Sequence, residues 1–266
     1  MTEAKPERQI LKIEKQIELS VPPETVWKML TDPNELTRWF PLEARITPGQ
    51  GGEISLSWGP TYEGGASIEI WEPNRKIAWA ETSAGLPLRV EWTIESRGGK
   101  TLLRLVQSSF ASGADWESEF YDSTNYGWDF MLLNLRHYLE RHPGEPRLVA
   151  WPRQKKELPR RQIYDKLLAP EGIFQSGTAR NFSAGQRYSL RTATGEEWSG
   201  RVEFVVPARG FCVTVESLND GLAWLTIEGA GPEHDAQLWF SLYGLPAARV
   251  KGIEDRWADA LKKIFA

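Results

Sequence analysis

Residues 124–142 read TNYGWDFMLLNLRHYLERH, and the spacing of their apolar side chains predicts an amphipathic helix. The apolar positions recur at intervals of four, three and four residues, which is the period of one helical face: Trp128, Leu132, Leu135 and Leu139. Polar residues fall largely on the opposite side, so the helix should lie against another element. Pro143 and Gly144 end it. Gly127 precedes Trp128, where a uniformly packed helix would carry a larger side chain.

Short alternating segments precede this helix and predict an antiparallel sheet. Residues 11–21 alternate apolar and polar side chains, and residues 24–40 predict two short helices with a break at 32–34. Six further strands follow, separated by turns rich in Pro and Gly: residues 42–48, 51–58, 65–73, 76–82, 88–96 and 100–110. Because helices and strands are segregated along the chain, we expect an α+β fold with one face of the sheet covered by helix.

The remainder of the chain repeats this order in weaker form. The segment RRQIYDKLLAPEGIF at 160–174 stands where the helix pair stood, and the final helix at 253–265 places Trp257 and Leu261 where Trp128 and Leu132 stood. The opening strand of this second copy is poor and its final helix is shorter. We interpret the repeat as an internal duplication that produced a reduced second domain.

The domain boundary is predicted where Pro, Gly and charge cluster. The expected organisation is a first domain at residues 1–143, a linker at 144–157 and a second domain at 158–266. A chain of 266 residues is long enough for two such domains.

Composition excludes several classes of function. The charged fraction is 26% and the net charge is −4, and the most basic stretch, residues 153–161, is too short for a nucleic-acid footprint. No segment approaches the roughly 20 apolar residues that cross a bilayer, and the N-terminus lacks a secretion signal. We therefore expect a cytoplasmic protein that binds neither nucleic acid nor membrane.

No catalytic residue, metal site or cofactor is predicted. Cys212 is the single cysteine, so neither an intramolecular disulfide nor a thiolate cluster can form within one chain. The histidines, His137, His142 and His234, make no recognisable set of metal ligands. A Gly-x-Ser-x-Gly nucleophile motif is also missing from the sequence.

Four segments in this order and spacing resemble the activator of Hsp-90 ATPase homologue-like family of the START-like helix-grip superfamily, also called SRPBCC: VPPETVWKMLTDPNELTRWF at 21–40, GGEISL at 51–56, IEIWEPNRKIAW at 68–79 and GWDFMLLNLRHYLE at 127–140. The resemblance covers residues 10–142 well and 157–266 loosely. It implies tandem helix-grip domains, each a curved antiparallel sheet around a C-terminal helix, with a cavity that takes apolar ligands in many relatives. Gly127 would leave room in that cavity, and Trp128 would form one wall.

Inward strand positions and the gripping face of the helix supply the candidate ligand-binding residues: Trp39, Trp58, Ile68, Trp79, Glu81, Trp92, Gln107, Ser109, Gly127, Trp128, Met131, Leu132 and Leu135. For any one tryptophan, core packing is the simpler explanation, although ligand pockets are themselves largely aromatic. The polar candidates discriminate better, because a buried polar group needs a partner. For Glu81 the alternative is a strand-end carboxylate in water.

Three functions are consistent with these features. The preferred one is non-enzymatic binding of an apolar small molecule by residues 10–142. The second is a protein-interaction module, with a chaperone or a second copy of the chain as its partner. The third is an enzyme of the cyclase or hydrolase type that uses Glu81 or another carboxylate of the cavity as a general base. The eukaryotic chaperone activators of the family also use an Asn-x-Trp-His-Trp element, which this sequence lacks, so we do not expect stimulation of a chaperone ATPase.

Overall fold

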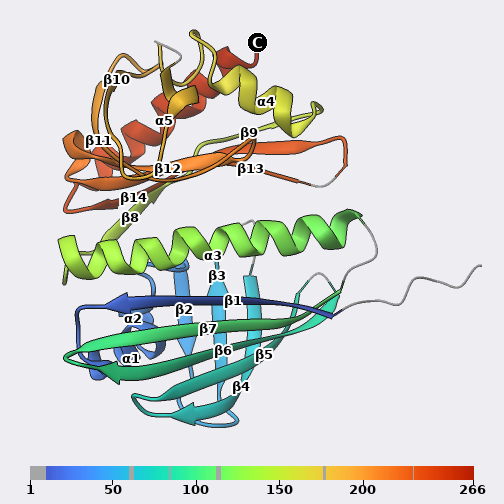
Figure 1. Ribbon diagram of the computed structural model, residues 1–266, viewed down its shortest axis with the longest axis vertical. Helices are drawn as coiled ribbons and strands as arrows, with labels where there is room; N and C mark the ends of the chain where they lie inside the picture. Colours follow the sequence, from blue (N-terminus) through green and yellow to red (C-terminus); the bar gives the residue numbers. More distant parts are fainter. Residues whose placement is uncertain (1–9, 60–62, 84, 112–114, 176–177, 230) are drawn as a thin grey trace, which may run out of the picture. The chain divides into compact units, whose positions relative to one another are not determined.

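The chain forms two compact units, Met1–Pro143 and Gly144–Ala266 (Figure 1). The computed structural model describes residues 10–59, 63–83, 85–111, 115–175, 178–229 and 231–266. Each unit contains one antiparallel sheet and a helix at its C-terminal end, so the predicted α+β class and the tandem helix-grip arrangement are confirmed. Among the described residues, none of the helices has the length and apolar character needed to cross a membrane.

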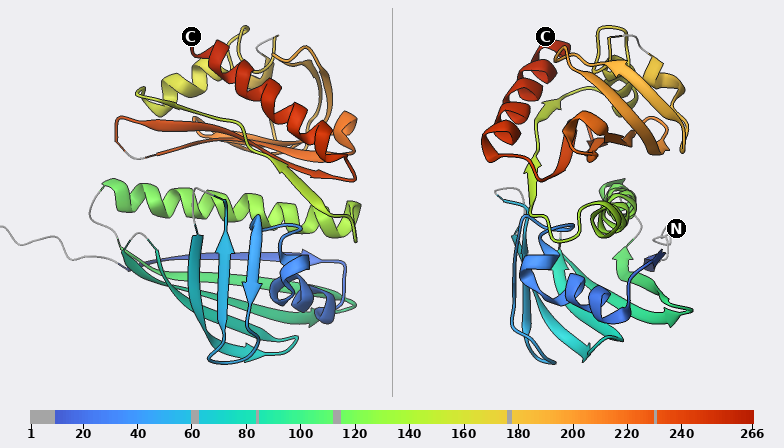
Figure 2. Two further views of the ribbon diagram at one scale, coloured as in Figure 1. Left: turned by 180° about the vertical axis from the view of Figure 1, so that it is seen from behind. Right: turned by 90° about the vertical axis from the view of Figure 1, so that its left-hand side faces the viewer.

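The first unit has a seven-stranded sheet in the order β1-β7-β6-β5-β4-β3-β2. Its elements are β1 (Ile10–Leu19), α1 (Pro23–Thr31), α2 (Pro33–Leu36), β2 (Glu43–Ile46), β3 (Glu53–Ser57), β4 (Glu63–Glu72), β5 (Lys76–Ser83), β6 (Leu86–Arg97), β7 (Lys100–Ala111) and α3 (Asp115–Arg141). The sheet bends around α3, which lies on its concave side (Figure 2). Every expected strand of this half is present, and so is the pair of short helices.

Two hydrogen bonds fix the end of the helix pair to the interior, and a third caps α2. Asp32 caps α2 by accepting a hydrogen bond from the backbone N–H of Asn34 at 2.9 Å. Trp39 is fully buried and its indole Nε1 donates to the carbonyl oxygen of Met29 at 2.9 Å. The Asn134 side chain on α3 donates to the carbonyl oxygen of Trp39 at 2.6 Å. These contacts hold the segment that carries Phe40 between α1 and α3.

Helix α3 begins at Asp115, nine residues before the predicted start at 124. Residues 115–123 read DWESEFYDS, and their mostly polar composition hides the apolar period on which the prediction relied. Phe120 nevertheless lies eight residues before Trp128, so it belongs to the same helical face.

Strand β7 contains a β-bulge near its end. Leu11 of β1 pairs with Phe110, whereas Ile13 pairs with Gln107, so Ser108 and Ser109 together oppose a single residue of β1. Ser109 adopts a positive φ of 73° within this bulge. The bulge resets the alternation of β7, and Phe110 is the next residue to be fully buried.

The second unit has a sheet in the order β10-β11-β12-β13-β14-β8, with β9 also paired to β14. Its elements are β8 (Arg147–Ala150), β9 (Arg153–Lys156), α4 (Arg160–Leu167), the 3-10 turn η1 (Thr178–Asn181), β10 (Arg187–Arg191), β11 (Glu197–Val206), β12 (Gly210–Val215), the 3-10 turn η2 (Glu216–Leu218), β13 (Gly221–Glu228), β14 (His234–Tyr243) and α5 (Ala247–Ile264). Trp257 of α5 packs against Trp198 of β11, with ring centroids 5.1 Å apart.

The second unit differs from the sequence expectation at three places. The segment at 144–157, expected as a linker, contributes β8 and β9 to the sheet because both strands hydrogen-bond to β14. The segment at 160–174 forms one helix, not a pair. Helix α5 starts at Ala247, before the expected position 253, and its 18 residues make it shorter than α3 with 27.

The hydrogen bond from Asn134 to Trp39 should be important for the first unit. Replacing Asn134 with Leu leaves a buried carbonyl oxygen without its donor, so we expect the free energy of unfolding to fall by about 1–3 kcal/mol. Hydrogen exchange of peptides from α3, measured by mass spectrometry, would report this as faster exchange. The exposed Glu140→Gln on the same helix is the control, and equal exchange rates in the two variants would contradict the expectation.

Candidate functional site

A cavity of about 280 Å³ lies inside the first unit, between α3 and the sheet. Helix α3 and four strands or their ends supply its wall: Phe120, Thr124, Gly127, Trp128 and Met131 from α3, Leu56 and Trp58 from the β3 region, Trp79 and Glu81 from β5, Leu88 and Val90 from β6, Gln107 from β7, and Phe40 after α2. The helical members share one face, so the cavity runs beneath the N-terminal and central turns of α3.

Aromatic rings form one side of the cavity. Phe40 stacks on Trp128 with ring centroids 5.0 Å apart and an angle of 27° between the ring planes. Trp58 meets Phe40 edge to face at 5.2 Å. Such offset and edge-to-face contacts stabilise aromatic pairs beyond the area that they bury. This side of the cavity is therefore a rigid wall.

Seven of the predicted residues lie on the cavity wall: Trp58, Trp79, Glu81, Gln107, Gly127, Trp128 and Met131. Five others lie in the filled interior and do not reach the cavity: Trp39, Ile68, Trp92, Leu132 and Leu135. Ser109 lies elsewhere and lines a depression beside Glu69 and Arg89.

The positions of Trp39, Trp92, Leu135 and Ser109 have physical causes. Trp92 lies behind the wall, edge to face with Trp128 at 5.4 Å and with Trp39 at 6.1 Å, so these rings fill the space that the cavity would otherwise occupy. Leu135 lies about 10 Å further along the helix axis than Trp128, at 1.5 Å per residue. Ser109 leaves the inward face because of the β7 bulge.

Six wall residues were not among the sequence candidates: Phe40, Leu56, Leu88, Val90, Phe120 and Thr124. Alternation would have found Leu56 beside Trp58, and it would have found Leu88 and Val90 beside Trp92, because each set shares one face of a strand. Phe120 and Thr124 were missed because α3 was predicted to start too late. The position of Phe40 depends on the long-range hydrogen bonds of Trp39, which leave no local pattern in the sequence.

Gly127 leaves open space in the wall. A methyl group added at its Cα would meet no atom within 4 Å, apart from its own helix backbone and chain neighbours. Glycine inside a helix costs about 1 kcal/mol relative to alanine, so the fold itself does not favour it here. The missing side chain contributes directly to the volume of the cavity.

Gln107 offers a hydrogen-bond donor to the cavity. Its amide oxygen accepts from Nε1 of Trp128 at 2.6 Å, and both side chains are buried. Because an indole N–H can only donate, the amide must present its oxygen to Trp128. The amide NH₂ group of Gln107 is then the part that can serve a ligand.

Glu81 is a partly buried carboxyl group that has no partner among the described residues. It forms no side-chain hydrogen bond or ion pair with the residues that the structure describes. Desolvation by burial raises the pKa of Glu81 above its ordinary value of 4.5. Glu69 and Arg89, which line a surface depression together with Glu81, pair with each other at 2.7 Å. Glu81 therefore lines both the apolar cavity and the depression that holds Arg89, and no cation among the described residues pairs with its carboxyl.

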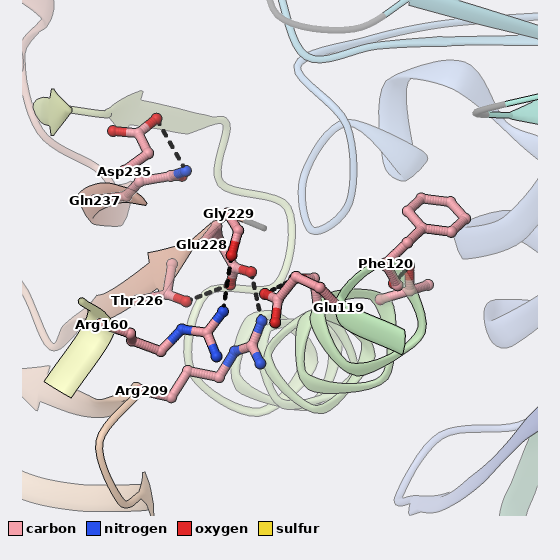
Figure 3. Close-up of polar contacts among 11 residues, drawn as sticks. Glu119, Phe120, Arg160, Arg209, Thr226, Glu228, Gly229, Asp235 and Gln237 are labelled. Carbon is pink, nitrogen blue, oxygen red and sulfur yellow. Dashed lines mark hydrogen bonds and ion pairs between the residues drawn. The ribbon is translucent and has the colours of Figure 1, made fainter. Parts of the chain in front are cut away.

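The second unit contains a polar cluster of a different kind (Figure 3). Arg209 pairs with Glu228 at 2.7 Å, Glu228 also accepts a hydrogen bond from Thr226, and Arg160 donates to the carbonyl oxygen of Gly229 at 3.0 Å. Arg209 and Glu228 thus pair with each other, as the partners of structural ion pairs do. The unpartnered carboxyl of Glu81 makes the cavity of the first unit the stronger candidate.

Comparisons with known proteins bear mainly on the first unit. Residues 20–140 match the model of the family described as Activator of Hsp90 ATPase homolog 1-like protein. The comparison with curated proteins gave no match. Among solved structures, the Aha1 dimer from Colwellia psychrerythraea is 21% identical over 50% of this chain and 99% of its own, with a TM-score of 0.43.

Two similar structures span both units. DynU16, a protein in the dynemicin biosynthetic locus, is 15% identical over 94% of this chain and 96% of its own, with a TM-score of 0.44. The di-domain ARO/CYC BexL from the BE-7585A biosynthetic pathway is 12% identical over 96% of this chain and 97% of its own, also with a TM-score of 0.44.

The environment of Glu81 predicts how pH affects stability. A carboxyl whose pKa is raised by folding stabilises the folded state below its ordinary pKa of 4.5, and that contribution is lost as the pH rises through the raised value. Glu81→Gln should therefore have a higher Tm than the unsubstituted protein at neutral pH, and the difference should vanish below pH 4.5.

Glu91→Gln is a control for which we expect the opposite change in Tm. Burial raises the pKa of Glu91, but hydrogen bonds from Lys76 and Arg89, both at 2.8 Å, outweigh this and lower it. Loss of the Glu91 carboxylate in Glu91→Gln should therefore lower the Tm at neutral pH. Thermal unfolding across this pH range measures both effects, and a lower Tm for Glu81→Gln at neutral pH would contradict our description of its surroundings.

Proposed function

Since residues 20–140 belong to the Activator of Hsp90 ATPase homolog 1-like family, we propose that the first unit binds an apolar small molecule in the cavity beneath α3. The observation that carries this proposal is the cavity itself. Its wall is aromatic and aliphatic, with three polar side chains, Glu81, Gln107 and Thr124. Ligand sites are typically apolar enclosures with a few polar groups that orient the ligand.

The size of the cavity limits the ligand. Sites for drug-sized molecules hold roughly 300–1,000 Å³, and this cavity, at about 280 Å³, lies at the lower limit. A molecule of one or two rings fits that volume better than a long lipid chain. The flat faces of Phe40, Trp58 and Trp128 would stack with planar rings.

Catalysis is a second candidate, because Glu81 has the surroundings of a general base. Enzymes raise the pKa of a carboxyl by burial so that it can exchange protons near neutral pH. In this alternative Glu81 would remove a proton from a ligand held against Phe40 and Trp128, as a cyclase or hydrolase requires. Exchange of a bound ligand's acidic C–H protons for deuterium, lost in Glu81→Gln, would support it over binding alone.

The interaction-module alternative receives less support. Among the described residues, Trp116 is the one exposed large apolar side chain, at 43% exposure. A single aromatic residue does not make a patch of several hundred Å², the size that marks docking surfaces. We therefore rank a chaperone or a second copy of the chain behind a small molecule as the partner.

Filling the gap at Gly127 tests ligand binding directly. Gly127→Leu would place four carbon atoms in the cavity without meeting another atom at Cβ, and it would remove the helical penalty of glycine. We expect the affinity for a lipophilic fluorescent dye to fall by at least about tenfold, which corresponds to about 1.4 kcal/mol of binding free energy. Stability should be unchanged or higher.

Gly127→Ala is the matched control for this experiment. It removes the same glycine penalty but fills little of the cavity, so its Tm should rise while dye binding is largely kept. If Gly127→Leu bound the dye as tightly as Gly127→Ala did, the cavity would not be the binding site.

A further inference from the structure

The charges around the cavity select among apolar ligands. The wall holds one carboxyl group, Glu81, and no Lys, Arg or His side chain among the described residues that line it. A fatty acid or other lipophilic anion would bring a second negative charge next to Glu81, and no cation among the described wall residues would neutralise either one. Two like charges at close range in a weakly solvated site repel each other strongly.

The aromatic wall favours the opposite charge. Phe40, Trp58, Trp79 and Trp128 all line the cavity, together with Phe120. The faces of such rings carry negative potential and attract cations, most strongly where water is excluded. A carboxylate together with several aromatic faces is the combination that recognises an ammonium group.

The ionised Glu81 also lowers the stability of the ligand-free protein, and a bound cation would restore that stability. Its carboxyl is partly buried and has no partner among the described residues. An acidic side chain in such a place is rare unless it is paired. A positively charged ligand would provide the missing partner through a charge-assisted hydrogen bond.

We propose that the cavity of the first unit binds a lipophilic amine, whose ammonium group pairs with Glu81 while its ring system packs against Phe40, Trp58 and Trp128. This inference rests on the proposed ligand-binding function and names the chemical class of the ligand. The NH₂ group of Gln107 provides a second polar contact, suited to an oxygen acceptor on the same ligand.

The pH dependence of amine binding follows from the same geometry. Burial raises the pKa of Glu81, and pairing with an ammonium group would lower it again, so amine affinity should increase as Glu81 ionises. No other ionisable side chain is present among the described lining residues. On the neighbouring surface, Glu69 of β4 and Arg89 of β6 pair with each other at 2.7 Å, and Arg89 also pairs with Glu91 at 2.8 Å.

Three probes with the same ring system test the proposal: 2-naphthylmethylamine, 2-naphthylmethanol and 2-naphthoate, titrated calorimetrically into the full chain. At neutral pH we expect the amine to bind about tenfold more tightly than the alcohol, the difference of one charge-assisted contact, and the carboxylate to bind most weakly. The preference for the amine should decline as the pH falls toward 4.5, the ordinary value for a glutamate.

Two variants identify the group responsible. Glu81→Gln should abolish the preference for the amine and leave the affinity for the alcohol within about twofold. Glu69→Gln removes the same charge from the neighbouring β4 without touching the cavity, so its preference for the amine should persist. A preference that survives in Glu81→Gln would overturn the assignment.

The failures of the two proposals can be distinguished. Equal affinity of the unsubstituted protein for the amine and the alcohol, with binding of both lost in Gly127→Leu, overturns the inference about the amine and leaves ligand binding standing. If none of the three probes nor the lipophilic dye binds, both proposals are overturned.

Discussion

The stacking of Phe40 on Trp128 determines how the interior of the first unit is divided. On one side of this pair, Trp39 and Trp92 fill the space completely, and on the other side the cavity remains open. The pair is held in place because Trp39 is tied to Met29 and to Asn134 by hydrogen bonds. The volume of the cavity therefore depends on these few buried contacts.

Two features of the cavity oppose the stability of the unit that contains it. Gly127 weakens helix α3, and Glu81 places an unpaired carboxyl beside apolar side chains. Natural sequences usually break such local rules at functional positions and are stabilised elsewhere. Both exceptions occur at one cavity, which is a stronger indication of a binding site than either would be alone.

The second unit has the same architecture with a different interior. Arg256 precedes Trp257 where Gly127 precedes Trp128, and its guanidinium pairs with Glu196 at 2.7 Å. Trp257 contacts Trp198 and Phe240, with centroid separations of 5.1 and 6.0 Å. The duplication therefore preserved the sheet and the gripping helix, while the residues at the helix face diverged. A shared fold does not imply a shared site.

The α+β class, the strands and helix pair of the first half, and the gripping helix of each half could be read from the sequence, because periods of two and 3.6 residues are local properties. The sequence also placed Trp58, Trp79, Glu81, Gln107 and Gly127 on the inward side. The tertiary structure alone decided that Ser109 turns away at a bulge, that Trp39, Trp92, Leu132 and Leu135 lie in filled space, and that Phe40 and Phe120 line the cavity. A cavity is volume that distant elements fail to fill, so it depends on contacts such as that between Asn134 and Trp39, which no local period encodes.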